Sequence, residues 1–121
     1  MAVWTDNVGD ADNGDYVLFE WGAGDPLDLG IENGMILTKR IACVAGQVLS
    51  LDGKEFFCDG RHVGTAQRTT SKGEPVASFD FTGEIPVGRY FVVGDNPMSY
   101  DSRYFGFVYQ GQLLGKVIFG I

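Results

Sequence analysis

The chain has 121 residues, which is enough for one domain with a substantial core and too few for two. Hydrophobic residues make up 45% of it and charged residues 21%, as in an ordinary globular protein. The net charge of −7 argues against nucleic acid as a partner, because phosphate binding needs a basic surface. No apolar run approaches the roughly 20 residues that cross a bilayer, and no signal-peptide pattern opens the chain, so a membrane anchor is expected only outside this sequence.

The residue pattern predicts an all-β fold. Eighteen glycines and little helical periodicity favour a single domain of short antiparallel strands and β-hairpins over residues 1–121. Residues 1–13 are expected to be loosely structured, because their charges and amides follow no strand or helix period. The expected strands are Asp15–Trp21, Met35–Val44, Gln47–Leu51, Glu55–Cys58, Arg89–Val93 and Leu113–Phe119.

Turn residues connect these expected strands. Asp52-Gly53 lies between two apolar runs and indicates a tight hairpin, and Asp59-Gly60 indicates a second turn before His62. The polar residues 65–84 predict a long irregular arm rather than a linker. That arm contains apolar Phe79 and Phe81, which need a surface to pack against.

Cys43 and Cys58 are 15 residues apart, on strands expected to be neighbours. Two thiols do not make a metal site, and the single histidine, His62, is not spaced to complete one, so no metal or cofactor is expected. The two thiols form a disulfide if the compartment is oxidising, worth roughly 3 kcal/mol. Alternatively, they are two unrelated buried thiols.

Lys39 lies within an otherwise apolar expected strand. Side chains in a strand alternate between faces, so Lys39 shares a face with Leu37 and Ile41, while Arg40 lies opposite. Burial on an apolar face lowers the pKa of a lysine, and a neutral lysine can act as a general base. Alternatively, the stem of Lys39 covers the apolar face and its charged end reaches water.

A second unusual segment runs from Gly94 to Gly106, directly after the apolar run 90–93. Gly-Asp-Asn-Pro marks the end of a strand, because glycine and asparagine tolerate turn angles and proline interrupts the ladder. The segment as a whole contains two acids, two serines and an arginine. They form either a capped, salt-bridged surface loop or a polar wall beside a reactive group.

Taken together, these segments resemble the type I signal peptidases and the related TraF-type peptidases of bacterial conjugation. The family pattern has a Gly-Asp strand, a Lys-Arg strand, and a later Gly-Asp-Asn…Ser-x-Asp-Ser-Arg segment. The last of these motifs is highly specific, and the Lys-Arg segment is moderately so. The matching residues are Gly14–Phe19, Lys39–Arg40 through Gly46, Gly94–Asn96, Ser99–Arg103, Gly106–Val108 and Leu114–Lys116.

The resemblance implies a signal-peptidase-like fold and a Ser/Lys site. By it, Lys39 is the general base, and Ser99 supplies the hydroxyl that orients the lysine amine. Such a loop has to be held rigid, which buried Asp–Arg pairs achieve through bidentate hydrogen bonds. The resemblance gives supporting roles to Arg40, Asp95, Asn96, Asp101 and Arg103, with ion pairs Asp101–Arg103 beneath the site and Asp95–Arg40 beside it.

The chain departs from the family pattern at a turn and at the nucleophile, besides Pro97 and Met98, which replace more polar residues common in signal peptidases. Ala45-Gly46-Gln47 stands where the family has a Pro-Gly-Asp turn, which we expect to affect stability more than chemistry. The family's nucleophilic serine lies in a Ser-Met-Pro-like box upstream of the Gly-Asp strand, and no serine precedes Ser50. Residues 3–5 match the aromatic stretch that follows this box in TraF-type enzymes, which places the expected serine a few residues before Met1.

Two hypotheses follow from the resemblance. In the first, the chain is the catalytic domain of a membrane-bound serine endopeptidase that cleaves signal peptides or pre-pilin and conjugation proteins, and its nucleophile is not in this chain. In the second, it is an inactive relative that assists pilus or conjugation assembly. Both imply a preprotein or pilin peptide as partner, an N-terminal membrane anchor outside the sequence, and a periplasmic or extracytoplasmic location. Neither implies a cofactor.

Overall fold

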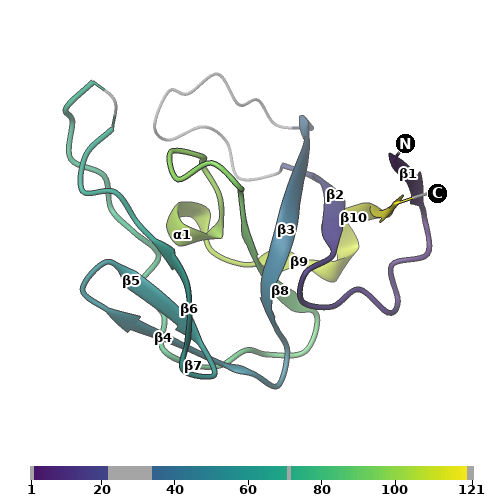
Figure 1. The fold of residues 1–121 in the computed structure, drawn as a ribbon, viewed down its shortest axis with the longest axis horizontal. Coiled ribbons are helices and arrows are strands. Elements are labelled where there is room, and N and C mark those ends of the chain that lie inside the picture. The colour runs from purple at the N-terminus through teal and green to yellow at the C-terminus, as the bar shows by residue number, and fades with distance from the viewer. Residues whose placement is uncertain (1, 22–33, 71, 120–121) are drawn as a thin grey trace.

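The fold is almost entirely β, as expected (Figure 1). The computed structural model describes residues 2–21, 34–70 and 72–119. Its elements are β1 (Ala2–Thr5), β2 (Tyr16–Glu20), β3 (Ile36–Val44), β4 (Val48–Asp52), β5 (Glu55–Cys58), β6 (Arg61–Thr65), β7 (Gly83–Glu84), β8 (Arg89–Val93), α1 (Ser102–Phe105), β9 (Val108–Tyr109), the 3₁₀ turn η1 (Gln110–Gln112) and β10 (Leu113–Phe119).

The described strands form two antiparallel sheets. The larger sheet has the order β1-β10-β2-β3-β8-β9, and the smaller has the order β6-β5-β4-β7. In Figure 1 the smaller sheet lies to one side of β3 and β8, and both termini lie at the far side. Strand β3 is therefore central, hydrogen-bonded to β2 and β8, and it continues directly into β4 of the second sheet.

Alternating apolar residues explain why these segments are strands. On β2, Val17 and Phe19 are fully buried, and they pack with Ile41 and Val92 into a core on one face of the larger sheet. A second core lies where the sheets meet and includes Leu49, Phe56 and Phe91. A disulfide between Cys43 of β3 and Cys58 of β5 joins the two sheets, which decides between the two alternatives left open for these cysteines.

The arm expected over residues 65–84 is described at residues 65–70 and 72–84. After Thr65, which ends β6, the described residues of the arm form an isolated bridge, Thr69 to Pro75, before the chain returns as β7. Phe79 and Phe81 pack on Phe107, with ring centroids 5.0 and 4.9 Å away. The arm thus covers part of the core at the junction of the sheets.

The N-terminal segment is more ordered than expected. Residues Ala2–Thr5 form β1, which pairs with Lys116–Phe119 of β10, while Met1 lies outside the described residues. The aromatic Trp4 contributes to this pairing, because its ring lies over Gly115, where no side chain stands in the way. The loose segment expected over residues 1–13 is therefore reduced to the turns after Thr5.

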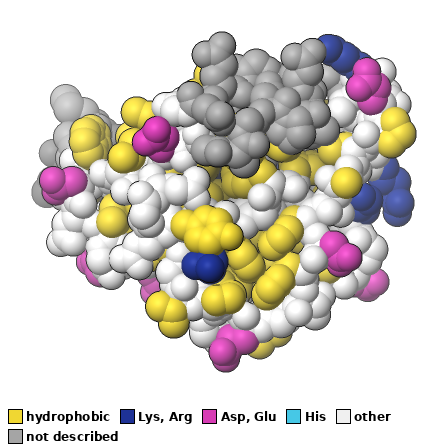
Figure 2. Space-filling view, turned by 180° about the vertical axis from the view of Figure 1, so that it is seen from behind, with side chains coloured by type: hydrophobic (Ala, Val, Ile, Leu, Met, Phe, Trp, Pro, Cys, Tyr) yellow, Lys and Arg dark blue, Asp and Glu magenta, His cyan; other side chains and the backbone are white. Residues whose placement is uncertain are grey.

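The surface carries hydrophobic side chains among acidic ones, as Figure 2 shows for one face. The large hydrophobic side chains exposed in the described residues include Trp4, Ile36, Val87 and Met98. None of the helices in the described residues has the length and hydropathy of a membrane span.

Candidate active site

Lys39 projects from the middle of β3 toward the core of the larger sheet. The strand register places it opposite Val17 of β2, on the face that buries Val17 and Ile41. Burial lowers the pKa of the Lys39 amine, and the positive charge of Arg103 adds to this, while Asp101 and Asp95 act in the opposite direction. The Lys39 side chain is half-buried rather than fully extended into water. Its amine therefore loses its proton more easily than the amine of a surface lysine does.

Ser99 and Lys39 meet at Gly94, the first residue after β8. A methyl group at Gly94 would overlap Ser99 Oγ, lie 2.6 Å from Ser99 Cβ and lie 3.3 Å from Lys39 Nζ. Both side chains therefore occupy the space that a larger residue at position 94 would fill. Glycine is therefore needed at the start of the Gly-Asp-Asn segment, because a side chain there would fill the space in which the serine and the lysine approach each other.

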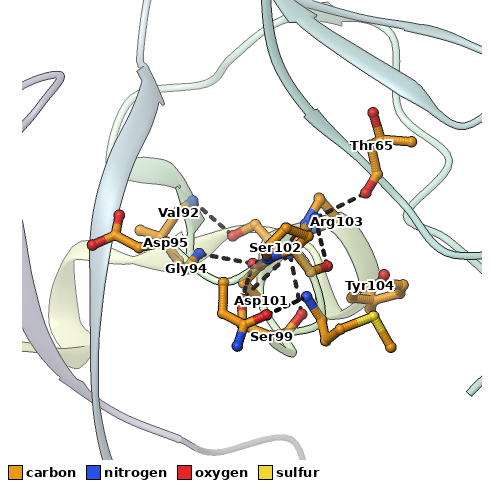
Figure 3. Close-up of polar contacts among 12 residues, drawn as sticks. Thr65, Val92, Gly94, Asp95, Ser99, Asp101, Ser102, Arg103 and Tyr104 are labelled. Carbon is orange, nitrogen blue, oxygen red and sulfur yellow. Dashed lines mark hydrogen bonds and ion pairs between the residues drawn. The ribbon is translucent and has the colours of Figure 1, made fainter. Parts of the chain in front are cut away.

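Asp101 organises the loop beneath this point (Figure 3). It is fully buried, and its carboxylate accepts hydrogen bonds from Ser99 Oγ and from the backbone N–H of Gly94, each at 2.8 Å. It also accepts from the backbone N–H of Arg103 as the N-cap of α1. The Ser99 hydroxyl hydrogen is therefore directed at Asp101, which leaves the Ser99 oxygen an acceptor toward other groups.

Arg103 compensates the buried charge of Asp101. Its Nε and Nη2 donate to the two carboxylate oxygens at 2.8 Å, which is the bidentate geometry that makes such pairs strong. Burial alone would lower the pKa of Arg103, but the hydrogen bond and the charge of Asp101 outweigh it and raise that pKa. The structure thus contains the Asp101–Arg103 ion pair expected beneath the site.

Arg40 and Asp95 lie on the opposite side of β3, as strand alternation predicts. They form an ion pair of 3.5 Å that is largely exposed, and Tyr16 Oη donates to Asp95 at 2.7 Å. Asn96 does not reach the lysine through any hydrogen bond in the described residues. Its side chain accepts from Met98 N and its carbonyl from Ser99 N, so it shapes the turn that carries Ser99.

No group of three His, Cys, Asp or Glu side chains in the described residues could hold a metal ion. The arrangement around Lys39 instead offers proton transfer: a half-buried amine of lowered pKa, an oriented hydroxyl and a neutralised carboxylate. The family model for signal peptidase, peptidase S26, matches residues 1–121.

The chain belongs to this family.

Individual relatives agree with the family match. The chain is 30% identical over 94 residues to signal peptidase I V of Bacillus subtilis, covering 68% of this chain and 55% of the relative. It is 41% identical over 69 residues to a signal peptidase I of Bacillus caldolyticus, covering 54% and 32%. The crystal structure of a signal peptidase I from Enterococcus faecalis superposes with a TM-score of 0.52 at 30% identity, covering 86% of this chain and 93% of that one. The chain spans about half or less of the length of the curated relatives that it matches.

The other described serines of this S26 chain are occupied elsewhere. Ser102 Oγ accepts from Val92 N in the core, Ser78 Oγ accepts from Lys54, and Ser50 lies on β4 of the second sheet. Ser71 lies outside the described residues. Among the described serines, Ser99 alone is recorded beside Lys39.

Sequence reasoning missed two features of the site. One is the role of Gly94, which comes from side chains that approach it rather than from its own turn angle. The other is Thr65, whose carbonyl accepts a hydrogen bond from Arg103 across the junction of the two sheets. No local signal could have revealed the second contact, because its partners are 38 residues apart. The Ala45-Gly46-Gln47 departure has a structural explanation: Gln47 Oε1 accepts from Val44 N and so closes this turn.

Proposed function

We propose that this chain is the catalytic domain of a membrane-bound serine endopeptidase that removes signal peptides from preproteins by a Ser/Lys dyad. The observation that carries the proposal is the placement of Lys39, a half-buried amine of lowered pKa beside Ser99 and Gly94. The family match over residues 1–121 supports it, as do the relatives named signal peptidase I.

In the proposed reaction, neutral Lys39 takes the proton of a serine hydroxyl as that oxygen attacks the scissile carbonyl. The resulting lysine ammonium then gives the proton to the departing amine, which leaves an ester between serine and the preprotein's signal segment. A water molecule, deprotonated by the same lysine, hydrolyses the ester and restores the enzyme. During these steps the hydrogen bond between Ser99 and Asp101 keeps the loop beside the Lys39 amine in place.

The nucleophile is proposed to come from sequence outside residues 1–121. Ser99 is poorly suited to the role, because its proton is already directed at the Asp101 carboxylate. The remaining described serines lie in the core, on the arm or on the second sheet. Residues 1–121 alone are therefore expected not to cleave a peptide.

The substrate is proposed to be an extended peptide that adds to a strand edge, with small side chains near the lysine. Signal peptides are the leading substrate, and pre-pilin or conjugation proteins are the narrower option within the same chemistry. The Cys43–Cys58 disulfide supports a location on the oxidising, extracytoplasmic side of the membrane, since disulfides persist in such compartments.

The test uses the full product of the native gene, with any residues that precede Met1, and residues 1–121 in parallel. Each protein is incubated with a preprotein carrying a signal peptide and with a pre-pilin, and products are identified by mass spectrometry. The proposal expects cleavage by the full product, loss of cleavage in its Lys39→Met variant, and normal cleavage in a Lys72→Met control, since Lys72 is exposed on the arm.

Each outcome has a definite meaning. Cleavage of the pre-pilin alone would narrow the substrate to the conjugation branch. A full product that binds either substrate and cleaves neither would overturn the protease proposal in favour of the assembly factor. Lys39-dependent cleavage by residues 1–121 would overturn the placement of the nucleophile outside them.

A further inference from the structure

All three guanidinium nitrogens of Arg103 donate hydrogen bonds, and one of their acceptors belongs to the smaller sheet. Within the loop, Nε and Nη2 bind Asp101, Nη2 also reaches the carbonyl and hydroxyl oxygens of Ser99 at 3.1 and 3.3 Å, and Nη1 reaches the Pro97 carbonyl at 3.2 Å. The second Nη1 hydrogen bond, 2.8 Å long, goes to the Thr65 carbonyl at the end of β6 (Figure 3). Arg103 thus ties the Ser99 turn to the smaller sheet.

Thr65 is itself held firmly. Its hydroxyl donates to Glu55 Oε1 at 2.7 Å, and the same carboxylate oxygen binds His62 at 2.8 Å, so β5 and β6 are cross-linked by side chains next to the Thr65 carbonyl. One residue later, Ala66 N donates to the Lys54 carbonyl at 2.8 Å. The carbonyl that receives Arg103 is therefore a fixed point rather than the end of a loose strand.

Gly64 lies against the stem of Arg103. A methyl group at position 64 would lie 3.1 Å from Arg103 Cδ and 3.8 Å from a methyl group of Val93. The φ angle of Gly64 is not in the positive range, so its backbone angle does not by itself require glycine. Strands favour side chains with a branched Cβ, and glycine weakens a strand interior. The need to leave room for the Arg103 stem therefore explains why position 64 is glycine.

We propose that Gly64 and Thr65 of β6 are positioning residues for the Ser/Lys site, because together they form the seat that sets where the Arg103 guanidinium, and with it Ser99, lies. This inference rests on the proposed function for its catalytic meaning. Gly64 fixes how closely the arginine stem approaches β6, and the Thr65 carbonyl fixes the direction of its Nη1. Neither residue touches Lys39 in any recorded contact, so both act through Arg103.

The route to the lysine is short. Arg103 binds both the carbonyl and the hydroxyl of Ser99, which shares the space over Gly94 with Lys39. The positive charge of Arg103 also contributes to the lowered pKa of the Lys39 amine. A displaced guanidinium therefore changes both the position of Ser99 and the electrostatic field at the lysine.

The experiment is a nuclear magnetic resonance titration of residues 1–121 labelled at lysine Cε and arginine Nε. Gly64→Ala and Gly64→Val push on the arginine stem to increasing extents. Gly111→Ala is the matched control, because its backbone is ordinary and its added methyl meets open space. The titration midpoint of Lys39 and the exchange rate of the Arg103 Nε–H are measured in each protein.

We expect Gly64→Ala to shift the Lys39 midpoint by about 0.2 pH unit, the size produced by moving a nearby unit charge a few tenths of an ångström. Gly64→Val should shift it further, with faster Nε–H exchange in both variants and no change in Gly111→Ala. In an Arg103→Lys background, Gly64→Ala should lose its effect, because the two residues act as one unit.

Titration curves of folded Gly64→Ala that superimpose on the wild type would overturn the seat while leaving the proposed function intact. The same holds if Gly64→Ala shifts the lysine equally with and without Arg103. A wild-type Lys39 that titrates as an ordinary lysine would instead overturn the proposed function, and the catalytic meaning of the seat with it.

Discussion

Replacing Gly94 by alanine places a methyl group where Ser99 and Lys39 meet. The new carbon would overlap Ser99 Oγ and lie 2.6 Å from Ser99 Cβ, whereas ordinary contacts begin at 3.4 Å. A new rotamer of Ser99 would move only its hydroxyl and would leave the Cβ overlap unchanged. The turn that carries Ser99 therefore has to retreat by about 1 Å, the scale of backbone shift that overpacking produces.

The cost of this retreat follows from the contacts it breaks. Ser99 Oγ loses its 2.8 Å hydrogen bond to the buried Asp101 carboxylate, which costs about 1.5–3 kcal/mol for a charged acceptor. Overpacking adds about 1–3 kcal/mol. We expect Gly94→Ala to lose about 2.5–6 kcal/mol of unfolding free energy, which lowers the Tm of a domain of this size by roughly 10–25 °C.

Urea and thermal unfolding followed by circular dichroism measure this loss, with Gly111→Ala as the control in open space. The backbone of Gly94 has no positive φ, so strain from turn angles does not contribute and the effect reports the clash alone. If Gly94→Ala and Gly111→Ala unfold at the same urea concentration and temperature, then Ser99 does not occupy the space over Gly94, and the geometry assigned to the site is wrong.

Three further predictions concern charge and cross-linking. Lys39→Met should keep or raise the unfolding free energy at pH 7, because it removes a charge whose burial lowers the lysine pKa. The gain should shrink as pH rises from that lowered pKa toward about 10.4, where the wild-type folded state loses its proton before the unfolded state does. Urea unfolding at pH 7 and 10 measures this, and a clear loss of stability would show that Lys39 holds a structural ion pair. Asp101→Asn should cost about 3–5 kcal/mol by leaving its buried arginine partner uncompensated, whereas Asp95→Asn in the exposed pair should cost less than about 1 kcal/mol. Equal losses in denaturant would contradict the burial argument. Replacing Cys43 and Cys58 together by alanine should cost about 3 kcal/mol for a closed loop of 15 residues, and a reductant should then have no further effect; an unchanged midpoint would mean that the cross-link adds nothing.

Sequence patterns identified the strands whose apolar periodicity is strong. The central strand β3 and its partner β8 lie where their apolar residues place them, and alternation along β3 correctly separates Lys39 from Arg40. These properties are local, so each can be derived from a few neighbouring residues.

The features that were missed depend on distant partners. Strand β1 forms because Trp4 and its neighbours pair with β10, more than a hundred residues later in the chain. Strand β6 contains a glycine and two basic side chains, so its sequence does not show a strand pattern. The helix α1 has only four residues, too few for a helical period, and exists because Asp101 caps it. Likewise, the seat for Arg103 is built from Thr65 across the sheet junction, so its contact has no sequence signature.

The hydrogen-bond inventory of Ser99 explains how a serine can serve a lysine without being the nucleophile. A hydroxyl has one hydrogen and two lone pairs, and the Ser99 hydrogen is donated to Asp101 while one lone pair faces Arg103 at 3.3 Å. The remaining lone pair can accept a hydrogen bond from a donor such as an N–H, but the hydroxyl has no further hydrogen to give. A neutral lysine that donates one N–H to Ser99 has its own lone pair turned away from that serine, toward whatever hydroxyl stands on its other side. In the proposed reaction, Asp101 would therefore set the direction of proton transfer at Lys39, because a Ser99 released from this carboxylate could offer its hydrogen to the amine and block the lone pair that this reaction needs.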